Sequence, residues 1–335
     1  MRKIKLIAET AWHHQGDFEF YKNLVTKIIE NKNTDFIKIH ITLDYDEYMN
    51  TDHNAYKDLK KMIFKEENWH DIINIINYSE KNKIFLFNDT KAIEIGMKYE
   101  PEIVEIHSAC LNDIHLLDSL KSNLKNETKV MLGVGGSTLY EIEKAIQRIG
   151  TENVILMHGF QNFPTKYSDI NFAKVKKIMN LYPDYEHGFA DHTAWDEPNN
   201  ILITLFGAAL GMNYIEKHVT TNFGEDRIDG SAAISFEMFD ELQKKLNLLS
   251  ECYGNGLLEM NDGEKKYSQF GPIKKAAFLN KNVKKGDLLT EELISFKRTS
   301  QTTNLTQIDV LEKVGKNFNA DYNKNTLLTK ELFLR

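Results

Sequence analysis

The feature that most constrains the fold of this chain is a regular alternation of short apolar runs with longer segments of helical period. From Lys3 onward, each short run ends in polar residues, and a segment with apolar residues at helical spacing follows it. This alternation is typical of repeated βα units, whose strands form a parallel sheet. About eight such runs are present, the number that closes a TIM barrel. The predicted strands are Ile4–Glu9, Phe36–His40, Ile84–Asn88, Ile103–Ile106, Val130–Gly133, Val154–His158, His187–Ala190 and Tyr214–His218.

The segments between these strands predict helices, and the chain is long enough for a second domain. The length of 335 residues exceeds the ~250 residues of an ordinary single barrel. The polar, glycine-containing segment Gly254–Gly271 is typical of a domain boundary, and short strands and turns follow it. We therefore predict a (β/α)8 barrel over 1–262, a linker over 263–273 and a small β-rich domain over 274–335. The clearest predicted helices are Phe18–Glu30, Trp69–Glu80, Ile114–Leu124, Leu139–Ile149, Ile201–Leu210 and Phe236–Glu251.

The composition of the chain argues against nucleic acid and membranes as binding partners. A formal net charge of −7 argues against nucleic acid, because neutralising phosphates requires a clustered basic surface. Cys110 and Cys252 are the two cysteines, which gives no disulfide framework, and no apolar leader precedes the first polar residues. No run approaches the ~20 apolar residues that span a bilayer. We expect a cytoplasmic protein that binds neither nucleic acid nor membrane.

The ends of the predicted strands are unusually polar, and in a TIM barrel the active site gathers at the carboxyl ends of the strands. Two neighbouring strands end in His192 and His218, and the barrel brings both imidazoles to one rim. Glu216 lies at a strand position of the same parity as His218. Imidazole suits Mn, Fe, Co or Zn, and a site with two histidines leaves positions open for substrate and water. The pattern predicts a metal on His192 and His218.

Other polar residues at these ends leave alternatives open. Lys38 points inward if His40 does, and it either binds an anionic substrate or forms a structural pair with Glu9. The Gly133–Gly136 turn either presents backbone N–H groups to an anion or only shapes the chain. A single strand-end histidine such as His107 or His158 is more often structural than a ligand. Trp12, Phe163 and Trp195 either form the wall of a pocket or pack in the core.

Several segments resemble the sialic acid synthase family, phosphoenolpyruvate-dependent enzymes that make nine-carbon keto-sugar acids from an N-acyl hexosamine. The resemblance covers nearly the whole chain. The C-terminal segment from Phe278 to Arg298 is similar to the antifreeze-like (SAF) domain appended to these barrels. The matching barrel segments are Ile7–Gly16, Ile37-Lys38, Leu156–His158, Phe163–Thr165, Gly188–Thr193 and Ile215–Thr220.

The resemblance implies roles for individual residues. It implies a divalent metal, Mn²⁺ before Co²⁺, Mg²⁺ or Zn²⁺, on His192 and His218, with Glu216 positioning water or aldehyde at the reacting carbon. Glu9 and Asp229 would hold sugar hydroxyls. Arg298 would reach the barrel of a second subunit, which implies a domain-swapped homodimer. The residues implied at the phosphoenolpyruvate pocket are Lys38, Ser108, Asn88 and Gln161.

The chain also departs from the family pattern in that pocket. Glu105 stands where relatives place a lysine, and it is accompanied by His107 on the same strand. Asn88, Gly133, Gln161 and Ala190 replace other polar residues, and His13-His14 replaces Asn-His. A carboxylate ~4 Å from a phosphate costs on the order of 4 kcal/mol per charge at an effective dielectric near 20.

Three functions follow from these observations. The first is a metal-dependent synthase that condenses phosphoenolpyruvate with the aldehyde of an N-acyl amino sugar, releasing phosphate and giving a nonulosonic acid. The second is a divergent metal-dependent sugar aldolase, lyase or epimerase that does not use phosphoenolpyruvate, with Glu105 and His107 as an acid/base pair or extra ligands. The third is a non-catalytic sugar-binding relative.

Overall fold

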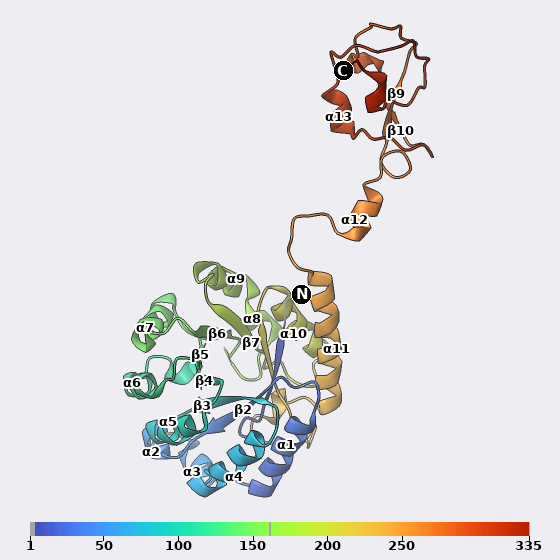
Figure 1. Cartoon of the computed structure of the whole chain (residues 1–335). Helices are drawn as coiled ribbons and strands as arrows, with labels where there is room; N and C mark the ends of the chain where they lie inside the picture. The colour runs from blue at the N-terminus through green and yellow to red at the C-terminus, as the bar shows by residue number, and fades with distance from the viewer. Residues whose placement is uncertain (1–3, 161, 335) are drawn as a thin grey trace. The chain divides into compact units, whose positions relative to one another are not determined.

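The computed structural model describes residues 4–160 and 162–334 (Figure 1). The chain divides into two compact units, the first ending at Asn255 and the second beginning at Gly256. The division therefore falls before residue 262, the predicted end of the barrel domain. Helix α12, Asp262–Tyr267, lies inside the segment that was predicted as boundary and linker.

The first unit is a closed barrel of eight parallel strands in sequential order, each neighbouring the next and β8 pairing with β1. This confirms the fold predicted from the sequence. Strand β3 begins two positions earlier than predicted and ends at Phe87, so Asn88 follows it. The strands are β1 Lys5–Glu9, β2 Phe36–Ile41, β3 Asn82–Phe87, β4 Ile103–Ile106, β5 Lys129–Gly133, β6 Val154–His158, β7 Glu186–Ala190 and β8 Tyr214–His218.

Helices connect the strands and surround the barrel (Figure 1). The predicted helix Trp69–Glu80 is wrong at both ends, because the helix spans Glu66–Asn77. It starts earlier because the Asn68 side chain accepts a hydrogen bond from the Lys65 backbone N–H and so caps the first turn. The helices are α1 Phe18–Glu30, α2 Tyr45–Tyr48, α3 Tyr56–Lys60, α4 Glu66–Asn77, α5 Thr90–Gly96, α6 Ile114–Asn123, α7 Leu139–Ile149, α8 Tyr167–Ile170, α9 Phe172–Leu181, α10 Asn200–Ala209 and α11 Phe236–Tyr253.

The alternation of side chains along each strand gives the barrel two apolar layers. One set of residues packs inside the barrel, for example Ile7, Phe36 and Met131. The other set, for example Leu6 and Ile37, packs between strands and helices. Each fully buried side chain of this size contributes about 1.5–3 kcal/mol. The interior becomes polar toward the carboxyl ends of the strands, where Glu9, Lys38, Glu105 and Glu216 are all buried.

The second unit is small and β-rich, as predicted. An antiparallel pair is formed by β9, Ala276–Leu279, and β10, Ile294–Lys297. A turn lies at Lys285–Asp287, where Gly286 adopts a φ of +91° that favours glycine. Helix α13 spans Gln307–Leu311. The core of this unit consists of Ala277, Leu279, Val283, Leu289, Leu305, Val310, Phe318, Leu328 and Phe333. The assignment of this unit as an SAF domain stays a prediction.

None of the helices in the described residues has the length and apolar character needed to cross a bilayer.

Candidate metal centre

Strand register brings the polar residues of the barrel interior together. Glu9 on β1 pairs with Lys38 on β2 on one side and with His218 on β8 on the other. Residues on neighbouring parallel strands at the same level place their side chains side by side. A cavity of about 220 Å³ opens at this level, and Trp12, Phe160 and Phe163 also line it.

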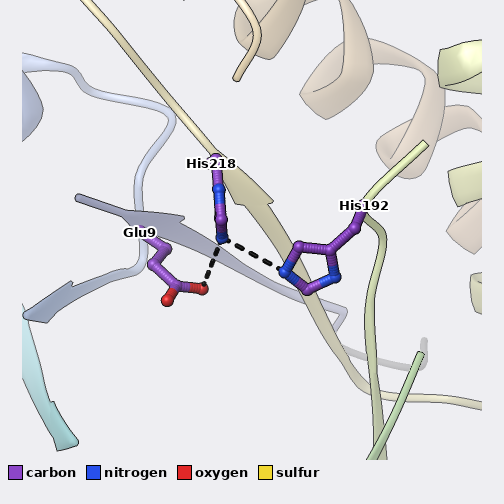
Figure 2. A group of neighbouring side chains, drawn as sticks. All are labelled: Glu9, His192 and His218. Carbon is purple, nitrogen blue, oxygen red and sulfur yellow. Dashed lines mark hydrogen bonds and ion pairs between the residues drawn. The ribbon is translucent and has the colours of Figure 1, made fainter. Parts of the chain in front are cut away.

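Three side chains at the β1–β8 junction converge on one point (Figure 2). The Nε2 atoms of His192 and His218 lie 3.1 Å apart, and the same atom of His218 lies 3.5 Å from Oε2 of Glu9. One ligand atom from each residue lies within 4.8 Å of the others, and all three residues are buried. Two imidazoles and a carboxylate are ligands that Mn, Fe, Co and Zn accept.

The protonation of the two imidazoles fits a cation between them. Nδ1 of His192 donates a hydrogen bond to the Ala190 carbonyl at 3.0 Å, which leaves the lone pair on Nε2. Burial lowers the pKa of His192 to about 4 and holds that of His218 well below its usual value, so both rings are neutral near pH 7. A metal ion on both Nε2 atoms would leave the proton of His218 on Nδ1. That buried Nδ1 has no hydrogen-bond partner among the described residues.

A buried network of hydrogen bonds and one ion pair holds the segments that carry His192 and His218. Asp191 Oδ1 accepts hydrogen bonds from the Thr193 backbone N–H at 2.9 Å and from its hydroxyl at 2.6 Å. Asp191 Oδ2 accepts from the Thr204 hydroxyl at 2.5 Å and faces Lys217 Nζ at 3.2 Å. Because Asp191 precedes His192 and Lys217 precedes His218, this network fixes the backbone of both candidate ligands.

Lys38 lies at the centre of three carboxylates. Its Nζ lies 2.8 Å from Glu105 Oε2, 3.0 Å from Glu216 Oε2 and 3.3 Å from Glu9 Oε2. Burial alone would lower the pKa of Lys38, but the charges of Glu105, Glu216 and Glu9 outweigh burial and raise it. Lys38 is therefore an ammonium ion at neutral pH. Of the two alternatives for Lys38, the structural pair with Glu9 is present and extends to two further glutamates.

The carboxylates of this cluster differ in their affinity for a proton. Burial and the nearby charge of Glu9 raise the pKa of Glu216 well above its usual value. Burial acts to raise the pKa of Glu9, but Lys38, His218, a hydrogen bond from Glu216 and His40 together outweigh burial and hold this pKa well below the usual range. Glu216 therefore has the higher affinity for a proton, and Glu9 is the more readily ionised of the two carboxyl groups. His40 forms a hydrogen bond with the other oxygen of Glu9.

Four further residues predicted at the site line the same cavity: Asn88, His107, Ser108 and Asp229. Asn88 donates a hydrogen bond to the Thr42 hydroxyl at 2.8 Å. Asp229 Oδ2 accepts from the Trp12 backbone N–H at 3.0 Å, and burial raises the pKa of Asp229. The structure thus brings both the predicted metal side and the predicted donor side to one cavity.

The remaining predicted residues lie elsewhere. His13 is fully buried, and its Nδ1 donates to the Thr10 carbonyl at 3.1 Å. Its ring meets that of His218 edge-on at 5.8 Å. Arg298 belongs to the second unit, where its Nη2 donates to the Pro272 carbonyl at 3.0 Å. Gln161 lies outside the described residues.

Sequence reasoning missed one feature of this site. It assigned Glu9 to sugar hydroxyls, whereas Glu9 lies beside the two histidines; closing the barrel from β8 back to β1 would have revealed this neighbour. The expectation that His158 is structural agrees with its contacts. The period of two turns its side chain outward, where Nε2 of His158 lies 3.1 Å from Nδ1 of His187.

Comparisons with known proteins agree with this architecture. The model of the NeuB family matches residues 27–257, more than two thirds of the chain. An uncharacterized protein of Methanocaldococcus jannaschii is 27% identical over 299 residues, covering 88% of this chain and 84% of its own. The N,N'-diacetyllegionaminic acid synthase of Campylobacter jejuni is 23% identical over 346 residues, covering 98% and 99%. The crystal structure of a putative spore coat polysaccharide biosynthesis protein E from Chromobacterium violaceum superposes with a TM-score of 0.83 at 18% identity. The superposition covers 99% of this chain and 100% of that chain, and it shows that the two proteins share a fold.

Proposed function

Because this chain belongs to the NeuB family, we propose that it is a metal-dependent enzyme that forms a carbon–carbon bond at the aldehyde carbon of an open-chain amino sugar. The observation that carries the proposal is the convergence of Glu9, His192 and His218 at the carboxyl ends of the barrel strands. Mn²⁺, which the family resemblance implies first, is the first candidate for the ion, and the same ligands also accept Co²⁺, Mg²⁺ and Zn²⁺.

Each residue of the site has a distinct part in this proposal. Glu9, His192 and His218 would hold a divalent ion, which would supply Lewis-acid chemistry for a carbonyl oxygen and for developing alkoxide charge. Glu216 holds a proton next to this centre and orients water or the aldehyde. Lys38 keeps the glutamates in place. Asp229 accepts a hydrogen bond from a sugar hydroxyl.

In the first form of the proposal the donor is phosphoenolpyruvate, as the family resemblance implies. Its methylene carbon bonds to the aldehyde carbon, water adds at the neighbouring carbon and inorganic phosphate leaves. The product is a nonulosonic acid. The name of the relative from Campylobacter jejuni, a diacetyllegionaminic acid synthase, supports this product class. Lys38 and Ser108, which line the cavity, are the residues implied at the phosphate.

In the second form the enzyme acts on the same type of sugar as an aldolase or lyase, without phosphoenolpyruvate. The observation that favours it is the contact between Lys38 and Glu105, which places a carboxylate beside the cation that a phosphate would need. A phosphate-bearing donor would face this carboxylate inside a buried cavity, where charge repulsion is strong.

The experiment that tests the proposal runs the reaction in both directions. Mn²⁺-loaded protein is incubated with phosphoenolpyruvate and a panel of N-acyl hexosamines, and phosphate release is measured together with product mass. In parallel, nine-carbon keto-sugar acids are offered, and pyruvate release is measured. Either activity, absent from the His192→Gln protein, supports the proposal. Sugar binding without turnover in either direction would identify a non-catalytic relative and overturn it.

We propose further that Arg298 completes the barrel site of a second copy of the chain. Its exposed position in the second unit supports this. Mixing Arg298→Ala protein with His192→Gln protein should then restore activity that neither has alone, because a mixed dimer contains one intact site. A monomer by light scattering, or no recovery on mixing, would contradict the proposal.

A further inference from the structure

His40 lies on strand β2 at the carboxyl-end rim of the barrel, beside the candidate metal centre. Lys38 pairs in register with Glu9, and His40 is two positions further along the same strand. Because side chains alternate along a strand, His40 points into the barrel as Lys38 does, whereas Ile39 and Ile41 pack between strands and helices. The His40 side chain is 12% exposed and lines the cavity. It therefore lies within reach of the end of the Glu9 side chain.

A hydrogen bond joins Nε2 of His40 to Oε1 of Glu9. Because the pKa of Glu9 is held well below its usual range, Glu9 is a carboxylate that accepts, and Nε2 of His40 is the donor. Hydrogen bonds to a carboxylate are shorter and stronger than those between neutral groups. This one restricts the rotation of the Glu9 carboxylate.

The second oxygen of Glu9 has lone pairs to spare. Oε2 is buried, and it accepts no hydrogen bond from any described residue. It lies 3.5 Å from Nε2 of His218 and 3.3 Å from Nζ of Lys38, the latter as an ion pair without a hydrogen bond. Buried acceptors are normally paired. A cation beside His218 would satisfy this oxygen together with the imidazoles.

The two oxygens of Glu9 are thus divided between two partners. Oε1 is occupied by His40, so Oε2 is the oxygen that remains for an ion on His192 and His218. A carboxylate that binds through one oxygen leaves positions on the ion for substrate and water, as metal-ion catalysis requires. Without His40 the carboxylate could turn toward the ammonium of Lys38, which already lies 3.3 Å from Oε2.

From this geometry we infer that His40 is a positioning residue for the metal centre, because its hydrogen bond to Oε1 of Glu9 directs Oε2 toward the ion. His40 acts through Glu9 and does not itself bind the ion. The inference rests on the metal centre of the proposed function, and it holds for either form of the reaction proposed above.

The test measures the Mn²⁺ affinity of the full chain from the electron paramagnetic resonance signal of the free ion. His40→Gln keeps an N–H donor at the reach of Nε2, whereas the donor of His40→Asn is too short to reach Glu9. We expect His40→Asn to bind Mn²⁺ about tenfold more weakly than the wild type, and His40→Gln to stay within about threefold of it. The controls are His115→Asn and His115→Gln, the same changes at an exposed position of α6, and both should bind as the wild type.

A second comparison asks whether His40 acts through Glu9. In the Glu9→Ala background, His40→Asn should cause no further loss of Mn²⁺ affinity, because the carboxylate that His40 orients is gone. A purely structural effect of His40 would lower the affinity equally in both backgrounds. If His40→Asn does not fold, His40→Leu, which is close to histidine in size and has no donor, takes its place.

The outcomes separate this inference from the proposed reaction. The expected order of affinities supports the role of His40 even where no turnover is found, because only binding is measured. Equal Mn²⁺ affinity of His40→Asn and the wild type, or an equal loss with and without Glu9, would overturn it while leaving the proposed reaction intact. A wild type that does not bind Mn²⁺ would overturn both the metal centre and the role of His40.

Discussion

The Nε2 atoms of His192 and His218 lie 3.1 Å apart at the junction where β8 closes on β1, with Glu9 Oε2 3.5 Å from the second imidazole. Two neutral imidazoles that direct nitrogen toward each other can share only one proton. A cation satisfies both nitrogens and the carboxylate together. The place where β8 pairs with β1, with His192 beside it, is therefore the candidate metal centre of the barrel.

Asp191 should affect metal affinity without being a ligand. The change Asp191→Asn removes the ion pair with Lys217 and disturbs the hydrogen bonds that hold the residue before His192. We expect Mn²⁺ affinity to fall by about 10-fold, as is typical for outer-sphere partners of metal ligands. Calorimetric titration of the variant and of the exposed control Asp196→Asn measures this. An unchanged affinity in Asp191→Asn would show that the network has no influence on the site.

Lys38 should contribute to stability through its three carboxylates. Removing the ammonium with Lys38→Met leaves buried carboxylates without a counter-ion, and we expect a loss of about 3 kcal/mol in the free energy of unfolding at pH 7. The double variant Lys38→Met, Glu105→Gln should recover part of this loss, because it removes one unpaired charge. Denaturant titrations of both, with exposed Lys176→Met as control, give the result. Equal stability of wild type and Lys38→Met would contradict the account of this cluster.

Histidines buried in the neutral form should make the barrel sensitive to acid. His14 packs against Phe64 with ring centroids 4.3 Å apart, and burial lowers its pKa to about 3. Because the folded pKa lies below the unfolded value of 6.5, the unfolded chain binds the proton first, and stability falls as pH drops below 6.5. Replacing His14 with Phe should reduce the loss between pH 7.5 and pH 5 by about 2 kcal/mol. Unfolding measured at both pH values tests this, and an unchanged difference between them would refute it.

Gly133 should tolerate no side chain. An added Cβ would lie 2.6 Å from the backbone N of Ser108, which lies just after strand β4. The change Gly133→Ala therefore pushes the end of strand β5 away from this segment. We expect a loss of about 1–3 kcal/mol of stability. Gly263→Ala is the matched control, because an added Cβ there meets only the Asn261 side-chain oxygen, at 3.1 Å, and its effect should be small. A melting temperature of Gly133→Ala equal to that of the wild type would show that the loop yields freely.

The barrel could be predicted from the sequence because the alternation of short apolar runs with helical segments repeats through the whole unit. Three strands, for example Tyr214–His218, have the predicted bounds. The start of α4 could not be predicted, because it depends on one side-chain cap at Asn68. Likewise the division at Asn255 depends on packing between segments far apart in the chain.

The site was only partly predictable for a related reason. His192 and His218 follow from strand position, since consecutive strands are neighbours in a barrel. Glu9 joins them through closure between the first and last strand, a contact between residues 209 positions apart. Lys38 contacts Glu105 and Glu216 across the barrel interior. The order of the strands alone does not predict which side chains meet across this interior.

The most direct test of the metal centre is to count Mn²⁺ bound per chain by the electron paramagnetic resonance signal of the free ion. The wild type should bind one ion per chain, and Glu9→Gln, His192→Gln and His218→Gln should each weaken binding by about 100-fold or more. His115→Gln, an exposed histidine on α6, should bind as the wild type. Tight binding that survives all three substitutions, or a wild type that leaves Mn²⁺ free at millimolar concentration, would contradict the account.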